Sequence, residues 1–124
     1  MTHVALIGPN ADAQTLRTAI STRGYQVDAP ADLQGWVRDP GPRAVVLRVG
    51  GHEEHDTLNL LRGLRPGLTV LALLEQADPF TQQTFLRAGA AAAIHHGAHP
   101  DTVVALLDAV TDGPDAGVQL EAVA

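Results

Sequence analysis

Histidines and their acidic neighbours are the side chains in this sequence best suited to bind a metal or respond to pH. His52 and His55 enclose two glutamates, and His95, His96 and His99 form a second group further along the chain. Imidazoles three or four residues apart on one helix can share a metal ion, and histidine changes charge near neutral pH. No second shell of hydrogen-bonding residues is evident around either group. We therefore expect solvated loop histidines and no bound metal, with metal binding and pH sensing as open alternatives.

Several kinds of catalysis are excluded by residue types that the chain lacks. All eight cations are arginine, and the chain contains neither lysine nor cysteine. Mechanisms that need a lysine amine, a thiol or a cysteine-bound zinc are therefore excluded. Gly50-Gly51 is not followed by a P-loop or dinucleotide fingerprint, and no nucleophile–base pair or paired carboxylates are visible. The sequence predicts a protein that is not an enzyme and has no cofactor.

Length and charge restrict the partners. The chain has 124 residues, of which 45% are hydrophobic, which suits one domain with a packed core. Its 8 basic against 14 acidic residues, a formal net charge of −6, argue against binding to a phosphate backbone. No apolar run approaches the ~20 residues that span a bilayer, and the N-terminus lacks the basic region of a signal peptide. We expect a cytoplasmic protein that contacts neither nucleic acid nor membrane.

Apolar runs of strand length alternate with stretches of helical period. The predicted strands are 4–7, 25–27, 44–47, 68–73 and 91–94. The predicted helices are 12–23, a short helix that begins near 32 and ends before Pro40, 53–64, one from 78 to Gly89, and one from 100 through Val110. From Gly113 onward the composition turns to Gly, Pro, Asp and Ala. We expect a domain over 1–112 and a flexible tail over 113–124.

The strands read as continuous apolar runs, which is typical of a parallel sheet covered on both faces. The sequence therefore predicts an α/β sandwich of three layers. In such sheets, sites form beyond the carboxyl ends of the strands. We expect any site in the loops 8–11, 48–55, 74–78 and 95–100.

Several stretches resemble the receiver domain of response regulators, over roughly residues 3 to 111. The stretches that carry the likeness are 16–17 with 24–25, 42–47, 60–65, and the sequence Phe-Leu-Arg-Ala-Gly-Ala at 85–90. The resemblance implies the flavodoxin-like, CheY-like (βα)5 fold with sheet order 2-1-3-4-5. It also implies a role in two-component-type signalling.

The phosphorylation pocket implied by this resemblance is degenerate. Active receivers carry an acidic pair for magnesium after the first strand, a phosphate-accepting Asp after the third, Ser or Thr after the fourth and Lys after the fifth. The matching positions hold Asn10 with no carboxylate before Asp12, then Arg48, Leu74 and His96. Magnesium needs hard oxygen ligands, and an aspartyl phosphate needs a nucleophilic carboxylate. We interpret the chain as a pseudo-receiver that is not phosphorylated.

Arg48 is expected at the end of a buried strand, where an unpaired guanidinium costs several kcal/mol. The candidate partners are Asp12, Glu53 and Glu75, with Asn10 as a neutral acceptor. We expect an internal ion pair. Binding of an anion from solution is the alternative.

Two functions follow from these observations. The first is a signalling module that binds a protein partner, or a second copy, through the fourth helix, fifth strand and fifth helix. The resemblance implies this face, which would be bordered by Gln82, Gln83, Arg87, Ala91 and Ala93. The second function is a sensor that binds a small molecule or anion beside Arg48 and His96.

Overall fold

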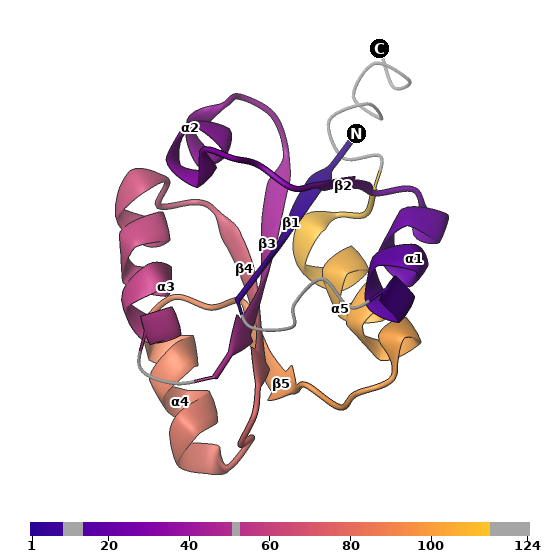
Figure 1. Cartoon of the computed structure of the whole chain (residues 1–124). Helices are drawn as coiled ribbons and strands as arrows, with labels where there is room; N and C mark the ends of the chain where they lie inside the picture. The colour runs from indigo at the N-terminus through magenta and orange to yellow at the C-terminus, as the bar shows by residue number, and fades with distance from the viewer. Residues whose placement is uncertain (9–13, 51–52, 115–124) are drawn as a thin grey trace.

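The chain forms one sheet with helices packed on both of its faces (Figure 1). The computed structural model describes residues 1–8, 14–50 and 53–114. The strands are β1 (His3–Ile7), β2 (Gln26–Asp28), β3 (Arg43–Val49), β4 (Thr69–Leu74) and β5 (Ala92–His95). The helices are α1 (Gln14–Arg23), α2 (Leu33–Arg38), α3 (Glu53–Leu64), α4 (Pro79–Arg87) and α5 (Pro100–Thr111).

The sheet order is β2-β1-β3-β4-β5, and each neighbouring pair is parallel. This confirms the predicted α/β sandwich and the strand order implied by the resemblance. Helices α2, α3 and α4 cover one face, and α1 and α5 cover the other (Figure 1). All five strands therefore end at one common edge, which we call the carboxyl edge. Their starts form the amino edge.

The core is divided by the sheet into two layers, because successive strand residues point to opposite faces. In β3, Val45, Leu47 and Val49 belong to the cluster beneath α2, α3 and α4. Ala44 and Val46 belong to the cluster beneath α1 and α5. This alternation also fixes which way the side chains near the strand ends point.

The third strand is longer than predicted. The sequence predicts 44–47, whereas the strand continues to Val49, which pairs with Leu74 of β4. Pairing with β4 holds β3 in extended form through Val49, two residues past its last pair with β1. Arg48 therefore lies inside the strand instead of in the loop after it.

The two ends of the described chain are joined at the amino edge. The Thr2 hydroxyl is fully buried and donates to the Gly113 carbonyl at 2.8 Å, and the Thr2 amide donates to the Pro114 carbonyl at 2.8 Å. The predicted flexible tail begins at 113, but Gly113 and Pro114 are both buried. The domain thus extends at least two residues further than predicted, and the rest of the predicted tail lies outside the described residues.

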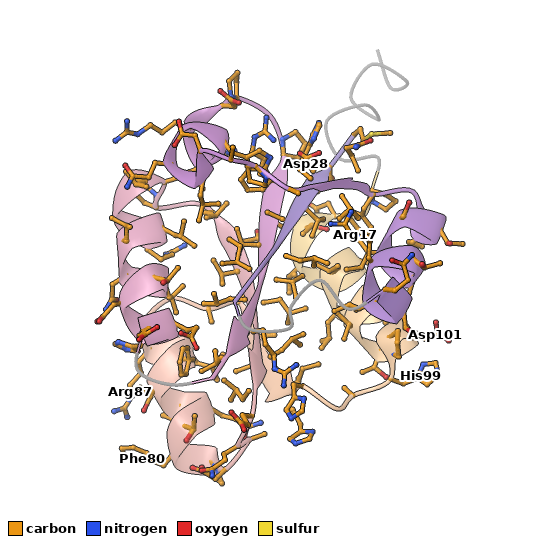
Figure 2. All side chains as sticks on the ribbon, viewed as in Figure 1. Arg17, Asp28, Phe80, Arg87, His99 and Asp101 are labelled. Atoms are coloured by element: carbon orange, nitrogen blue, oxygen red, sulfur yellow. The ribbon has the colours of Figure 1, made fainter. Side chains whose placement is uncertain are left out.

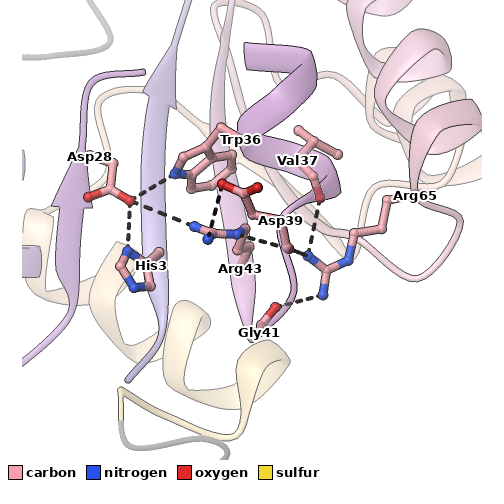
Figure 3. Close-up of polar contacts among 8 residues, drawn as sticks. All are labelled: His3, Asp28, Trp36, Val37, Asp39, Gly41, Arg43 and Arg65. Atoms are coloured by element: carbon pink, nitrogen blue, oxygen red, sulfur yellow. Dashed lines mark hydrogen bonds and ion pairs between the residues drawn. The ribbon is translucent and has the colours of Figure 1, made fainter. Parts of the chain in front are cut away.

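Asp28 organises a polar network at the amino edge (Figure 3). Its Oδ2 lies 2.7 Å from His3 Nδ1 and accepts a hydrogen bond of 2.8 Å from the Trp36 indole. Arg43 Nη1 lies 3.8 Å from the same oxygen, and the Arg43 guanidinium lies 4.9 Å from the Trp36 ring centroid. Burial raises the pKa of Asp28, but the hydrogen bonds from Trp36 and His3 outweigh it and leave the pKa below its usual value.

Arg65 extends this network by binding backbone carbonyls (Figure 3). Its Nη1 donates to the carbonyls of Val37 and Asp39 at 3.2 Å each, and its Nη2 donates to the Gly41 carbonyl at 2.7 Å. One side chain on the segment after α3 thereby fixes the turn between α2 and β3. The amino edge is held by charged side chains whose partners all belong to the chain.

Candidate functional site

The carboxyl edge brings Arg48, Glu75, His95 and His96 together. Arg48 lies near the end of β3, Glu75 follows β4, His95 ends β5 and His96 follows it. Gly8 closes this edge on the side of β1, with a φ of 103° that favours glycine. A Cβ on Gly8 would stand 2.2 Å from the Arg48 carbonyl oxygen. Only glycine lets the chain leave β1 so close to the β3 backbone.

Arg48 has a buried donor that the described residues do not satisfy. It follows the alternation of Ala44 and Val46, so its side chain points to the face covered by α1 and α5. Within residues 1–8, 14–50 and 53–114, its Nε has no hydrogen-bond partner. In that same part of the chain, neither Glu53 nor Glu75 forms an ion pair with Arg48.

The expected internal ion pair of Arg48 is therefore wrong for both described candidates. Glu53 begins α3 and Glu75 follows β4, and within the described residues no ion pair joins either of them to Arg48. The other two candidates, Asp12 and Asn10, lie outside the described residues. A buried donor with no acceptor is uncommon in folded proteins and marks a place that needs explanation.

His96 is electrostatically linked to Arg48. Desolvation, followed by the charges of Arg48 and His95, lowers the pKa of His96 below its ordinary 6.5, whereas Glu75 opposes the shift. The rings of His95 and His96 lie 4.6 Å apart, and the His96 amide donates to the Leu74 carbonyl at 2.9 Å. The structure thus places two of the five predicted pocket residues, Arg48 and His96, in one site.

Leu74 does not face this site. It is fully buried in the cluster beneath α3 and α4, on the opposite face of the sheet from Arg48. Arg48 pairs with Leu73, and Leu74 is one residue further along β4, so the two side chains alternate to different faces. The predicted pocket is therefore wrong in this respect. Leu74 contributes its backbone to the edge and its side chain to the core.

The remaining histidines have separate structural roles. His99 Nδ1 accepts from the Asp101 amide at 3.1 Å and caps α5, while His95 Nδ1 accepts from the Gly97 amide at 3.0 Å. His55 packs edge-on against Phe85 with ring centroids 5.5 Å apart. Among the described residues, no three His, Asp or Glu side chains converge closely enough to hold a metal ion. His52 lies outside that part of the chain.

The sequence matches no protein-family model and no curated protein. The structure is similar to the receiver domain of the Francisella response regulator 1452, with a TM-score of 0.74 and 12% identity over 90% of this chain and 96% of that one. It is similar to the beryllofluoride-activated NtrC4 receiver domain dimer, with a TM-score of 0.73 and 11% identity over 90% and 96%. A CheY-like protein (tadZ) from Pseudomonas aeruginosa PAO1 gives 0.67 and 21% over 90% and 93%. This chain has the receiver-domain fold.

The residues predicted to border a partner face are only partly exposed. Gln83, Arg87 and Ala91 are exposed. Ala93 is buried in the core, and the part-buried Gln82 side chain donates to its carbonyl at 3.3 Å. Ala93 is therefore wrong as a contact residue, because its strand neighbours and α4 enclose it. In the described residues, every helix is too short or too polar to cross a lipid bilayer.

A cavity that the sequence did not reveal lies on the other face of this receiver fold. It has a volume of about 660 Å³ and lies between α3, α4 and the ends of β3 and β4. Its lining includes the apolar residues Val49, Leu74, Phe80 and Phe85 and the acids Asp56 and Glu75. Phe80 projects outward from α4 (Figure 2) and is 81% exposed.

Proposed function

We propose that this chain is a non-enzymatic, cytoplasmic signalling module of a two-component-type pathway that acts without phosphorylation. The observation that carries the proposal is Arg48, which stands near the end of β3 where active receivers hold the phosphate-accepting Asp. The receiver fold supports the signalling role. The absence of lysine from the whole sequence supports the loss of phosphorylation.

The chemistry at the carboxyl edge supports this proposal. A guanidinium is always charged, is not a nucleophile, and repels a divalent cation. His96 stands where the resemblance implies Lys, and burial and Arg48 favour its neutral form. A phosphoryl group would therefore find neither its acceptor nor its magnesium ligands among the described residues of this edge.

Incubation with magnesium and a small phosphodonor, or with beryllofluoride, tests the proposal. We expect no mass gain by mass spectrometry and no change in the amide spectrum. Arg48→Asp alone should give the same result, because the magnesium pair and the lysine remain absent. A gain of one phosphoryl group on any aspartate of the natural chain would contradict the proposal.

The output of such a module would be binding to a protein partner or to a second copy through α4, β5 and α5. Gln83, Arg87 and Ala91 supply exposed contacts there, and Leu86 of α4 is 43% exposed. The NtrC4 receiver domain, one of the similar structures, is described as a dimer. Sedimentation over a range of concentrations distinguishes self-association from a need for another protein.

A second function, an anion sensor at Arg48 and His96, is favoured by the unsatisfied Arg48 Nε. An oxyanion beside this donor would satisfy it and would also favour protonation of His96. Sulfate, phosphate or a nucleotide should then raise the melting temperature, and Arg48→Ala should abolish the rise. If these anions do not change the melting temperature, the anion-sensor hypothesis is wrong, and the proposal of an interaction module stands alone.

A further inference from the structure

The cavity between α3 and α4 has an apolar floor. Val49, Leu74 and Phe85 lie at its base with exposures of 6%, 0% and 5%, so the core itself forms the floor. His55 packs edge-on against Phe85 and holds that ring in place. A volume of about 660 Å³ lies in the range of natural small-molecule sites. The cavity can therefore take the apolar body of a small ligand.

The rim of the cavity is acidic. Asp56 on α3 and Glu75 after β4 both line it, and both are exposed. Neither carboxylate forms an ion pair within the part of the chain that the structure describes, and no arginine is among the described lining residues. The rim thus presents two carboxylates above an apolar floor, and the one basic side chain among the described lining residues, His55, is packed against Phe85.

Phe80 adds a feature that points to a ligand. It lines the cavity from the first turn of α4, yet 81% of the residue is exposed. An aromatic ring exposed at a rim gains from a cation placed over its face. Both the electron-rich face of the Phe80 ring and the carboxylates of Asp56 and Glu75 favour a positively charged ligand.

We propose that the α3–α4 cavity binds a small organic cation, an amine or guanidine carried on an apolar body. The body would pack on Val49, Leu74 and Phe85, and the charged end would lie between Asp56, Glu75 and the Phe80 ring. Glu75 also belongs to the carboxyl edge beside Arg48 and His96, but the floor of the cavity lies on the opposite face of the sheet from the Arg48 side chain. The site does not depend on the signalling role proposed above.

Three probes with similar bodies test the site: phenethylamine, phenethyl alcohol and phenylacetate. Binding is followed by amide chemical shifts of the full chain and by calorimetry at neutral pH. We expect the amine to bind about three- to tenfold more tightly than the alcohol, with phenylacetate weakest. Raising the salt concentration should reduce the advantage of the amine, because exposed charges are screened.

Variants at the rim keep the test independent of folding, since all the changed residues are exposed. The double variant Asp56→Asn, Glu75→Gln should remove the advantage of the amine, while Phe80→Ala should weaken the amine about two- to fivefold. Glu53→Gln, also exposed in the first turn of α3 but outside the lining, should leave binding unchanged.

Three outcomes would overturn the proposal. Equal binding of the amine and the alcohol would show an apolar slot without charge selection. An advantage of the amine that survives in the double variant would place the cation elsewhere. The absence of shifts for amides of α3 and α4 with every probe would show that the cavity binds no small molecule of this kind.

Discussion

Two arginines of the same strand have opposite surroundings. Arg43, at the start of β3, stacks on Trp36, lies near Asp28 and donates from Nε to the Asp39 carbonyl at 3.2 Å. Arg48, five positions further along, has a buried Nε without a partner among the described residues. The amino edge thus uses its charges to hold the fold together. The carboxyl edge leaves its charge without a described protein partner.

The difference between Arg43 and Arg48 suggests that the two edges of the sheet have different roles, the amino edge in stability and the carboxyl edge in binding. A buried donor that is satisfied by the chain contributes to folding, whereas an unsatisfied one costs free energy unless a ligand or another segment supplies the acceptor. In parallel α/β sheets, ligands bind beyond the carboxyl ends of the strands. The arrangement of Arg43 and Arg48 agrees with that rule.

The largest expected effect is at Asp28. Asp28→Ala removes the acceptor of the Trp36 indole and the carboxylate that faces His3 and Arg43. Stranded donors of this kind should lower the free energy of unfolding by about 2–3 kcal/mol. Urea denaturation of the natural chain and the variant measures this change in the free energy of unfolding. The control is Asp39→Ala, whose side chain is 64% exposed and which should cost less than about 0.5 kcal/mol.

Replacing either arginine by alanine should change the free energy of unfolding by less than Asp28→Ala does. Arg43→Ala loses packing on Trp36 and the contact with Asp28, and should cost about 1–2 kcal/mol. Arg48→Ala removes an unsatisfied donor, and the free energy of unfolding should stay within about 0.5 kcal/mol or rise. A loss above about 1 kcal/mol for Arg48→Ala would reveal an acceptor outside the described residues, with Asp12 as the first candidate.

The smallest expected effect is on the titration of His96. Its pKa lies below 6.5 in the folded chain, so the unfolded chain binds this proton at higher pH. The contribution of His96 to stability should therefore fall as the pH drops through 6.5 toward the folded pKa. Arg48→Ala should raise the pKa of His96, and Glu75→Gln should lower it further, as measured by NMR of the imidazole ring.

Arg38→Ala serves as the matched control for that titration. Arg38 ends α2 and lies away from the carboxyl edge, so its removal should leave the His96 titration unchanged. If Arg38→Ala and Arg48→Ala moved the pKa equally, the effect would come from net charge and not from proximity. The electrostatic link between Arg48 and His96 would then be disproved.

The fold was predictable from sequence because each element carries a local signal. Glu53–Leu64 was predicted with the observed bounds, since acidic residues begin it and Pro66 follows it. Gly89, with a φ of 113°, ends the turn after α4 as the sequence indicated. Strand ends were less accurate, because pairing with neighbours extends β3 through Val49 and adds Asp28 to β2.

The site was predictable only in part, because it depends on side-chain direction. Counting along the sequence placed Arg48 and Leu74 in one pocket, but strand alternation sends them to opposite faces. The network around Asp28 was missed, since Trp36 reads as an apolar core residue and its indole donor has no sequence signal. The α3–α4 cavity was missed for the same reason, because it forms between two helices that are distant in sequence.

The contacts of Thr2 with Gly113 and Pro114 bear on how the chain can be rearranged. They keep the start of the chain beside the end of α5 at the amino edge, away from Arg48 and from the α3–α4 cavity. Joining these two points with a short linker and opening the chain in the surface turn at Pro66-Gly67 should give a circular permutant with the same sheet. The order in which the five units are synthesised would change, whereas the neighbours of Arg48 and of the α3–α4 cavity would not.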